Sequence, residues 1–139
     1  MIAMSSTALD SAALEVELDS RDGRARLAKL VMQLFAHWGV STAEQAALLG
    51  LSADNRATLA RYRKGEPLAD SRDLLDRAGH LLGIHKSLQT LFPQDRDLAY
   101  RWMSTPNRRL GARPVDAVIQ RGFEGLLAIR RYLDFVRAG

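Results

Sequence analysis

The sequence of 139 residues predicts an all-α fold. Apolar side chains recur at steps of three and four residues through most of the chain, which is the spacing that places them on one face of a helix. Ser, Thr and Asp precede these segments and Gly and Pro follow them, as expected where helices begin and end. No alternation of apolar and polar residues persists over four or more positions, so no strand is expected.

The charges are unevenly distributed along the chain. Residues 1–20 hold four acids and no bases, residues 21–92 hold eleven bases and seven acids, and residues 93–139 hold nine bases and five acids. Nearly all the bases are Arg, which pairs with phosphates and carboxylates through two N–H groups at once. The basic body therefore favours an anionic partner, either a nucleic acid or an acidic protein surface.

The composition argues against several classes of protein. An apolar fraction of 47% is ordinary for a folded chain, and the absence of Cys leaves no thiolate zinc site and suits the cytoplasm. No apolar run approaches the roughly 20 residues that cross a bilayer, so no membrane partner is expected. His37, His80 and His85 lack the spacing of metal ligands, and no Gly-rich phosphate loop or nucleophile elbow is present. We expect neither an enzyme nor a cofactor.

The first predicted helix follows an irregular leader. Residues 1–20 show no sustained periodicity and are predicted to form a mobile tail. A helix is predicted from Arg21 until Gly39 ends it. Its apolar face consists of Leu27, Leu30, Val31, Leu34, Phe35 and Trp38.

Two short helices joined by a turn are predicted next. Ser41 or Thr42 offers an N-cap, and Glu44 is placed for a capping box. After a turn at Gly50–Leu51, Ser52 is expected to cap a third helix that continues to about residue 64. Two helices joined by a turn that contains Gly form the helix-turn-helix signature, so residues 21–68 are assigned to such a unit.

The third helix is predicted to carry a basic outer face. With Leu59 and Tyr62 in the core, that face shows Ala53, Asp54, Ala57, Ala60, Arg61 and Lys64. Small alanines allow a helix to enter the major groove of DNA. There, Arg61 and Lys64 can reach the edges of the nucleobases or the phosphates. The residues assigned to DNA contact are Ser52, Asn55, Arg56, Ala57, Arg61, Arg63 and Lys64. The alternative is a three-helix core whose Arg-rich face is merely solvated.

Residues 69–139 are assigned to a second helical domain. Asp70 or Ser71 is expected to cap a long helix that runs through Leu91, and Gly83 is expected to allow a bend in it. Further helices are predicted at about 95–103, 115–120 and 123–137.

A basic loop precedes the last two helices. Pro106 and Asn107 initiate a turn, Gly111 permits a positive φ, and Pro114 opens the next helix. Three arginines are expected to converge beside that helix, namely Arg108, Arg109 and Arg113. They would face a protein partner, hold a small anion at the helix N-terminus, or simply be solvated.

The final helix is predicted to have a core stripe and an outer face. The stripe contains Phe123, Leu126, Ile129, Leu133 and Val136. Beside or outside it lie Leu127, Arg130, Arg131, Tyr132, Phe135 and Arg137. Exposed Tyr, Phe and Arg are the residue types that anchor protein interfaces, and Tyr132, Arg137 and Gly139 are expected to project from the end of the helix.

The second half of the chain resembles the toxin-binding domain of the Xre/MbcA/ParS antitoxin family. The resemblance rests on the order and spacing of Trp102, Pro106, Asn107, Leu110, Gly111, Pro114, Asp116 and Gly122. In addition, the segment ATLARYRKGEPL at 57–68 resembles the end of an Xre-type recognition helix. Arg113, Val115 and Arg121 depart from the residues common at their positions in the family.

The resemblance implies an antitoxin that silences a RES-domain toxin, an enzyme that consumes NAD or transfers ADP-ribose from it. The C-terminal region would cover the cleft of the toxin, and the antitoxin would repress its own operon, alone or with toxin. The residues expected to contact the toxin are Asn107, Arg108, Arg109, Gly111, Arg113, Arg131, Tyr132, Phe135, Arg137, Ala138 and Gly139.

The alternative function is that of a stand-alone Xre-type transcriptional regulator whose C-terminal half mediates dimerisation. Under either function a homodimer is expected, because one recognition helix reads only a few base pairs. Phe35, Trp38, Leu81, Leu82 and Leu88 are also expected to offer more apolar surface than one small core buries. With toxin, the dimer would form a larger hetero-oligomer.

Overall fold

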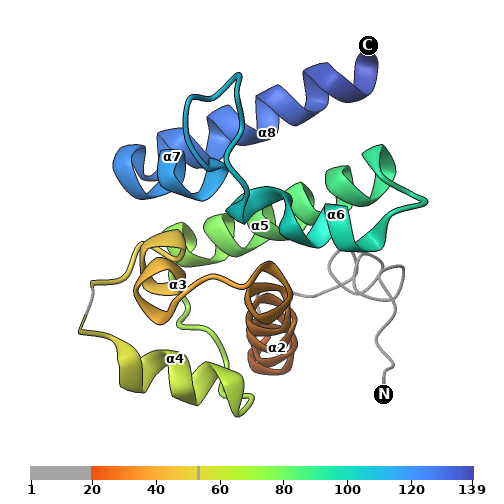
Figure 1. Ribbon diagram of the computed structural model, residues 1–139. Coiled ribbons are helices and arrows are strands. Elements are labelled where there is room, and N and C mark those ends of the chain that lie inside the picture. The colour runs from red at the N-terminus through yellow and green to blue at the C-terminus, as the bar shows by residue number, and fades with distance from the viewer. Residues whose placement is uncertain (1–19, 53) are drawn as a thin grey trace.

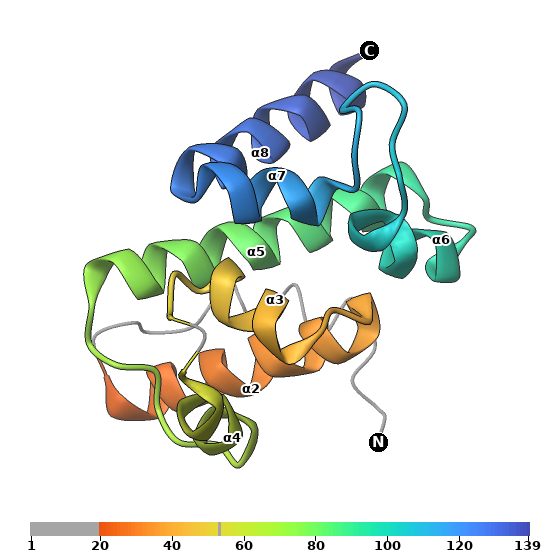
Figure 2. The same cartoon turned by 60° about the vertical axis from the view of Figure 1, so that its left-hand side comes forward.

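A long central helix, α5 (Arg72–Leu91), separates two groups of helices in the computed structural model (Figures 1 and 2). The structure describes residues 20–52 and 54–139, so the predicted tail up to residue 19 and Ala53 lie outside the described residues. On one side of α5 are α2 (Arg21–Trp38), α3 (Thr42–Leu48) and α4 (Arg56–Arg63). On the other side are α7 (Pro114–Arg121) and α8 (Phe123–Ala138).

A short helical segment follows α5 before the chain reaches the second group. It consists of α6 (Arg96–Arg101) and a 3-10 turn, η1 (Trp102–Ser104), close to the helix predicted at 95–103. The Ser104 hydroxyl donates to the carbonyl of Trp38 at 2.7 Å, which fastens this segment to the end of α2. The predicted all-α class is confirmed, because no strand occurs within the described ranges. None of the helices described there is long and apolar enough to span a bilayer.

Most helix ends are formed by the residues predicted to form them. Gly39 ends α2 with φ of 69°, in the left-handed region that Gly favours. The capping box of α3 is present, since Ser41 Oγ accepts from the Glu44 N–H at 3.2 Å and Glu44 accepts from the Ser41 N–H at 2.8 Å. Ser71 rather than Asp70 caps α5, and it accepts from the Leu74 N–H at 3.3 Å. Ser20, assigned to the tail, instead caps α2.

The predicted cap of the third helix is wrong. Helix α4 begins at Arg56, and Ser52 lies in a turn closed by the Asn55 N–H and the Ser52 carbonyl at 3.2 Å. The Ser52 hydroxyl accepts from the Asn55 side-chain amide at 2.9 Å, so it is engaged within this turn. The polar residue that ends the turn, Asn55, therefore occupies the N-cap position without a capping hydrogen bond from its side chain.

Two glycines allow helices to approach closely. Helix α5 is continuous through Gly83, where a bend had been expected, and a Cβ atom there would overlap the Arg130 guanidinium from α8. At Gly125 a Cβ atom would overlap the backbone carbonyl of Ala117, so glycine is needed where α7 and α8 touch.

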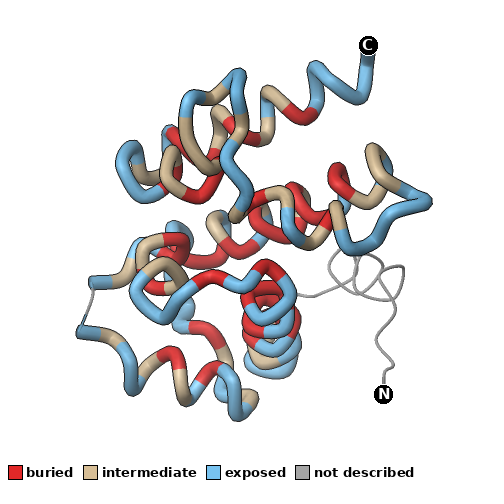
Figure 3. Tube along the Cα trace, in the orientation of Figure 1, coloured by how far each residue is buried: buried red, intermediate tan, exposed pale blue. Residues whose placement is uncertain are grey.

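One apolar core joins both groups of helices (Figure 3). Phe35 and Trp38 from α2, Leu81 from α5 and Leu126 from α8 are all at most 2% exposed. The expectation of spare apolar surface at the predicted dimer residues is therefore wrong, because Phe35, Trp38, Leu81, Leu82 and Leu88 are buried within the chain. In the final helix the core stripe ends at Leu133, since Val136 is 38% exposed.

Candidate protein and nucleic-acid interfaces

Helix α4 presents the basic outer face that its sequence predicts. Leu59 and Tyr62 are buried against the core at 0% and 5% exposure, which turns Ala57 and Lys64 to the outside. Arg56 and Arg63 are also exposed, on one flank of the helix. Helix α4 lies at the margin of the molecule, on the side of α5 away from α8 (Figures 1 and 2).

The basic side chains on and directly after α4 differ in whether they form an ion pair with an acidic side chain. Arg61 pairs with Glu66 at 3.3 Å and donates to the Thr58 hydroxyl at 3.1 Å. In the part of the chain that the structure describes, no ion pair involves Arg56, Arg63 or Lys64. These three side chains are therefore better placed than Arg61 to bind phosphates.

The predicted turn before α7 is held together by hydrogen bonds of Asn107. Its side-chain oxygen accepts from the N–H groups of Arg109 at 3.0 Å and Leu110 at 3.2 Å. Its backbone N–H donates to the Ala112 carbonyl at 3.0 Å, and Gly111 has the positive φ predicted for it, 73°. Asn107 and Gly111 therefore shape the loop, while the exposed side chains are those of Arg108 and Arg109.

Arg113 does not join the other two loop arginines as expected. Its guanidinium lies 2.7 Å from Glu44 of α3 and 2.8 Å from Asp116 of α7. The three side chains are 34%, 19% and 30% exposed, so the cluster is partly shielded from water. Arg113 thus ties the first group of helices to the second, and its charge is matched by carboxylates rather than offered to an anion.

The pKa values within this cluster reflect the same contacts. Hydrogen bonds to Asp116 and Glu44 raise the pKa of Arg113 above its usual range. The hydrogen bond from Arg113 lowers the pKa of Asp116. Burial acts to raise the pKa of Glu44, but hydrogen bonds from the Ser41 N–H and from Arg113 outweigh it and lower that pKa. All three groups are charged at neutral pH.

The end of α8 carries the most exposed apolar surface. Phe135 is 69% exposed and Val136 is 38% exposed, next to exposed Arg131 and Arg137. Ala138 and Gly139 are exposed as well. Tyr132 does not project as predicted, because its ring stacks on that of Trp102 with centroids 6.2 Å apart. Phe135 is therefore the aromatic side chain that this end of the helix presents.

Two features have no counterpart in the predicted sites. On α5, His80 lies 3.1 Å from the Arg130 guanidinium and packs edge-on against Phe123, and Arg77 lies over the same Phe123 ring. Burial, followed by the charge of Arg130, lowers the pKa of His80. The second feature is a pocket between α5 and α6 with a volume of about 240 Å³. Neither feature has a spacing motif, since the first forms only when α8 packs on α5, and the second only when α6 packs against the end of α5.

Family models match two consecutive parts of the chain. Residues 17–83 match the model of the antitoxin Xre-like helix-turn-helix domain. Residues 87–139 match that of the antitoxin Xre/MbcA/ParS C-terminal toxin-binding domain. None of the curated proteins matches the chain. The first match contains α4, and the second contains the Asn107 loop and α8.

Proposed function

The chain belongs to the Xre/MbcA/ParS family of antitoxins, and we propose that it neutralises a RES-domain toxin and represses its own operon. The toxin would consume NAD or transfer ADP-ribose from it, and the end of α8 would cover its active-site cleft. Both partners would be met in the cytoplasm, and the antitoxin would act as a homodimer within a larger complex with toxin.

The observation that supports neutralisation through α8 is the exposure of Phe135. Phe135 is 69% exposed, so the apolar surface of its aromatic ring is in contact with water. A partner that covers this ring removes the apolar surface from water, which favours binding. Arg131 and Arg137 flank it on the same helix. Arg137 lies 3.8 Å from Asp134, and both arginines are exposed and can pair with acidic groups around a cleft. The core stripe ends at Leu133, so the residues beyond it contribute little to the fold.

Autoregulation is supported by α4. Its outer face combines small Ala57 with exposed Arg63 and Lys64, and such a helix fits a major groove and its phosphates. Binding of this kind is strongly salt-dependent, because each phosphate contact releases counterions.

Removal of residues 135–139 tests the proposal. Co-expressed with the toxin-sized product of the adjacent open reading frame, the truncated chain should fail to restore growth, whereas the full chain should restore it. Circular dichroism should show a largely intact helical fold, and gel shifts should show unchanged operator binding.

Two single substitutions localise the effect. Phe135→Ala should weaken protection, while Ile119→Ala, which changes another exposed apolar side chain on α7, should not. If the truncated chain protects cells as well as the full chain, occlusion by α8 is wrong. If it also becomes monomeric in light scattering, the alternative of a stand-alone regulator that dimerises through its C-terminal half gains support.

A further inference from the structure

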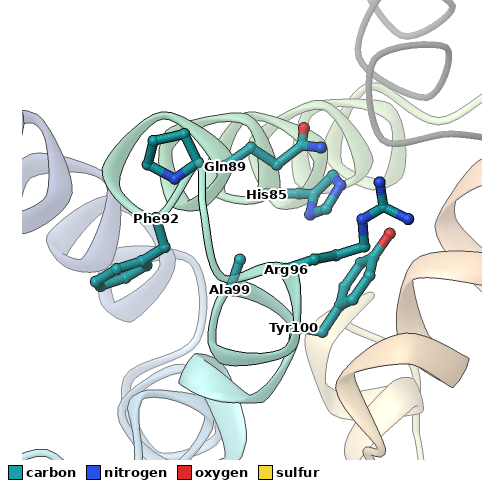
Figure 4. Close-up of a pocket in the computed structure, with 7 residues that line it drawn as sticks. His85, Gln89, Phe92, Arg96, Ala99 and Tyr100 are labelled. Carbon is teal, nitrogen blue, oxygen red and sulfur yellow. The ribbon is translucent and has the colours of Figure 1, made fainter.

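A pocket of about 240 Å³ opens between the end of α5 and the start of α6 (Figure 4). It is lined by His85, Gln89, Phe92, Pro93, Arg96, Ala99 and Tyr100. All of these except His85 fall within the segment 87–139 that matches the toxin-binding domain. The volume lies below the roughly 300–1,000 Å³ of sites for drug-sized ligands and suits a single large side chain.

The lining combines apolar walls with a polar side. Phe92, Pro93 and Ala99 supply apolar surface. Figure 4 shows the polar ends of Gln89, His85, Arg96 and Tyr100 gathered on the side of the pocket away from Phe92. None of the lining residues is acidic, so the charge at the opening is that of Arg96.

His85 is the unusual member of the lining. It is 0% exposed, and neither of its ring nitrogens has a hydrogen-bond partner within the described residues. Its ring stacks on Tyr100 with centroids 5.4 Å apart, and Tyr100 stacks in turn on His37 at 4.2 Å. Burial, followed by the nearby charge of His37, lowers the pKa of His85 to about 4, so at neutral pH the ring offers one donor and one acceptor.

A buried polar ring without partners lowers the stability of the free protein. A phenylalanine would stack on Tyr100 in the same way without this cost. The unmatched nitrogens, on a ring that lines the pocket, therefore indicate a partner group that completes the hydrogen bonds.

We propose that the pocket receives a tyrosine side chain of the toxin. The phenol hydroxyl both donates and accepts, which matches a neutral imidazole, and the ring matches the walls formed by Phe92 and Ala99. Arg96 can lie over the face of such a ring. This inference rests on the proposed function, because the toxin is the partner that carries the tyrosine.

The position of the pocket favours the toxin over other partners. Contacts from His80 to Phe123 and from Gly83 to Arg130 show that α5 and α8 run side by side in the same direction. The last turns of α8 therefore lie on the same side of the molecule as α6 (Figures 1 and 2). A toxin that covers Phe135 can reach the pocket with the same surface.

His85→Phe separates a binding role from a structural one. It should weaken toxin binding about tenfold in calorimetry, the order of effect expected for one anchoring contact, while the thermal unfolding midpoint stays the same or rises. The matched control is His37→Phe, since His37 also stacks on Tyr100 but is not among the residues that line the pocket, and this change should leave toxin affinity unchanged. An unchanged affinity for His85→Phe, or a lowered midpoint with equal loss in the control, would overturn the inference.

Two further measurements keep the test decisive. Ala99→Leu places a larger side chain at the pocket wall and should also weaken toxin binding, even if His85→Phe does not fold. In the free protein, millimolar p-cresol, which has the tyrosine ring and hydroxyl, should shift the NMR signals of the His85 ring, and Ala99→Leu should abolish the shift. Absence of a shift overturns the inference. A p-cresol shift in a protein that binds no toxin instead overturns the proposed function and supports the pocket chemistry.

Discussion

The buried ring of His85 makes stability depend on pH. Its pKa is about 4 in the folded chain, against an ordinary value of 6.5, because burial disfavours the charged ring. Between these values the unfolded chain binds a proton that the folded chain does not, so the free energy of unfolding should fall as the pH drops from 6.5 to 4. The loss should approach about 3 kcal/mol. Urea denaturation across this range measures it.

His85→Phe should remove most of this slope. A smaller slope should remain, because the pKa of His80 is also lowered and acts in the same direction. Below this range Glu44 and Asp116, whose pKa values are lowered, should cost further stability as they become protonated in both variants. An equal slope in the wild type and in His85→Phe would show that His85 is not the group responsible.

Single residues were the hardest features to predict from the sequence. The arginines of the Asn107 loop were expected to act together, but Arg113 pairs with Glu44, which lies 69 positions away in the chain. The spacing of residues along a helix carries no information on such a contact. The same holds for His85, whose burial follows from the packing of Tyr100 against it and not from its neighbours in sequence.

Helices and their ends were predicted well where the signals are local. The capping box at Ser41 and the positive φ at Gly39 depend on residues within one turn, and both were predicted. The start of α4 was predicted wrongly, because Ser52 and Asn55 are both good N-cap residues. The Ser52 hydroxyl accepts from Asn55 within the turn that precedes α4, so Asn55 takes the N-cap position. The spacing predicts a stripe on α8 that reaches Val136, but the burial ends at Leu133, since Val136 is 38% exposed.

Arg113 should stabilise the junction between α3 and α7. Arg113→Ala leaves Glu44, which is 19% exposed, with no guanidinium beside it, and should cost about 1–3 kcal/mol in denaturant unfolding. Arg101→Ala is the matched control, since it breaks an ion pair with Asp97 in which both side chains are more than half exposed. That change should cost at most about 0.5 kcal/mol. Equal effects would mean that the contact with α3 adds nothing.

Helix α4 should bind the operator through the basic side chains that form no ion pair within the described residues. Arg63→Ala with Lys64→Ala should weaken binding and reduce the slope of log affinity against log salt by about 2. The matched control removes the same charge from the Asn107 loop, with Arg108→Ala and Arg109→Ala. Gel shifts at several salt concentrations compare the two. If both double variants lose the same affinity, the effect is one of net charge and α4 does not lie on the DNA.

The oligomeric state is a property of the whole molecule, and the packing of the core within one chain does not determine it. The aromatic residues expected at a dimer interface are buried within one chain, so the expectation of a homodimer now rests on DNA geometry. One short recognition helix reads only a few base pairs, and an operator should therefore bind two chains on half-sites about 34 Å apart. Light scattering of the antitoxin with operator DNA measures this stoichiometry. One chain per operator would contradict it.

The fold as a whole followed from the sequence because its parts are helices with local signals and one shared core. The two proposed surfaces could be assigned to particular elements, α4 and α8, for the same reason. The contacts of single side chains on these elements could not be predicted, since Arg61 pairs with Glu66 and Tyr132 stacks on Trp102, so both side chains are already engaged within the chain.

The placement of α4 and α8 on opposite sides of α5 has a consequence for how the two partners are held (Figure 1). A body seated on α8 leaves the outer face of α4 uncovered, and a duplex along α4 leaves α8 uncovered. If the toxin and the operator bind where we propose, they need not compete for space, and one antitoxin would hold both at once. Under the proposed function, toxin bound to α8 would be held at the operator while α4 stays on the DNA.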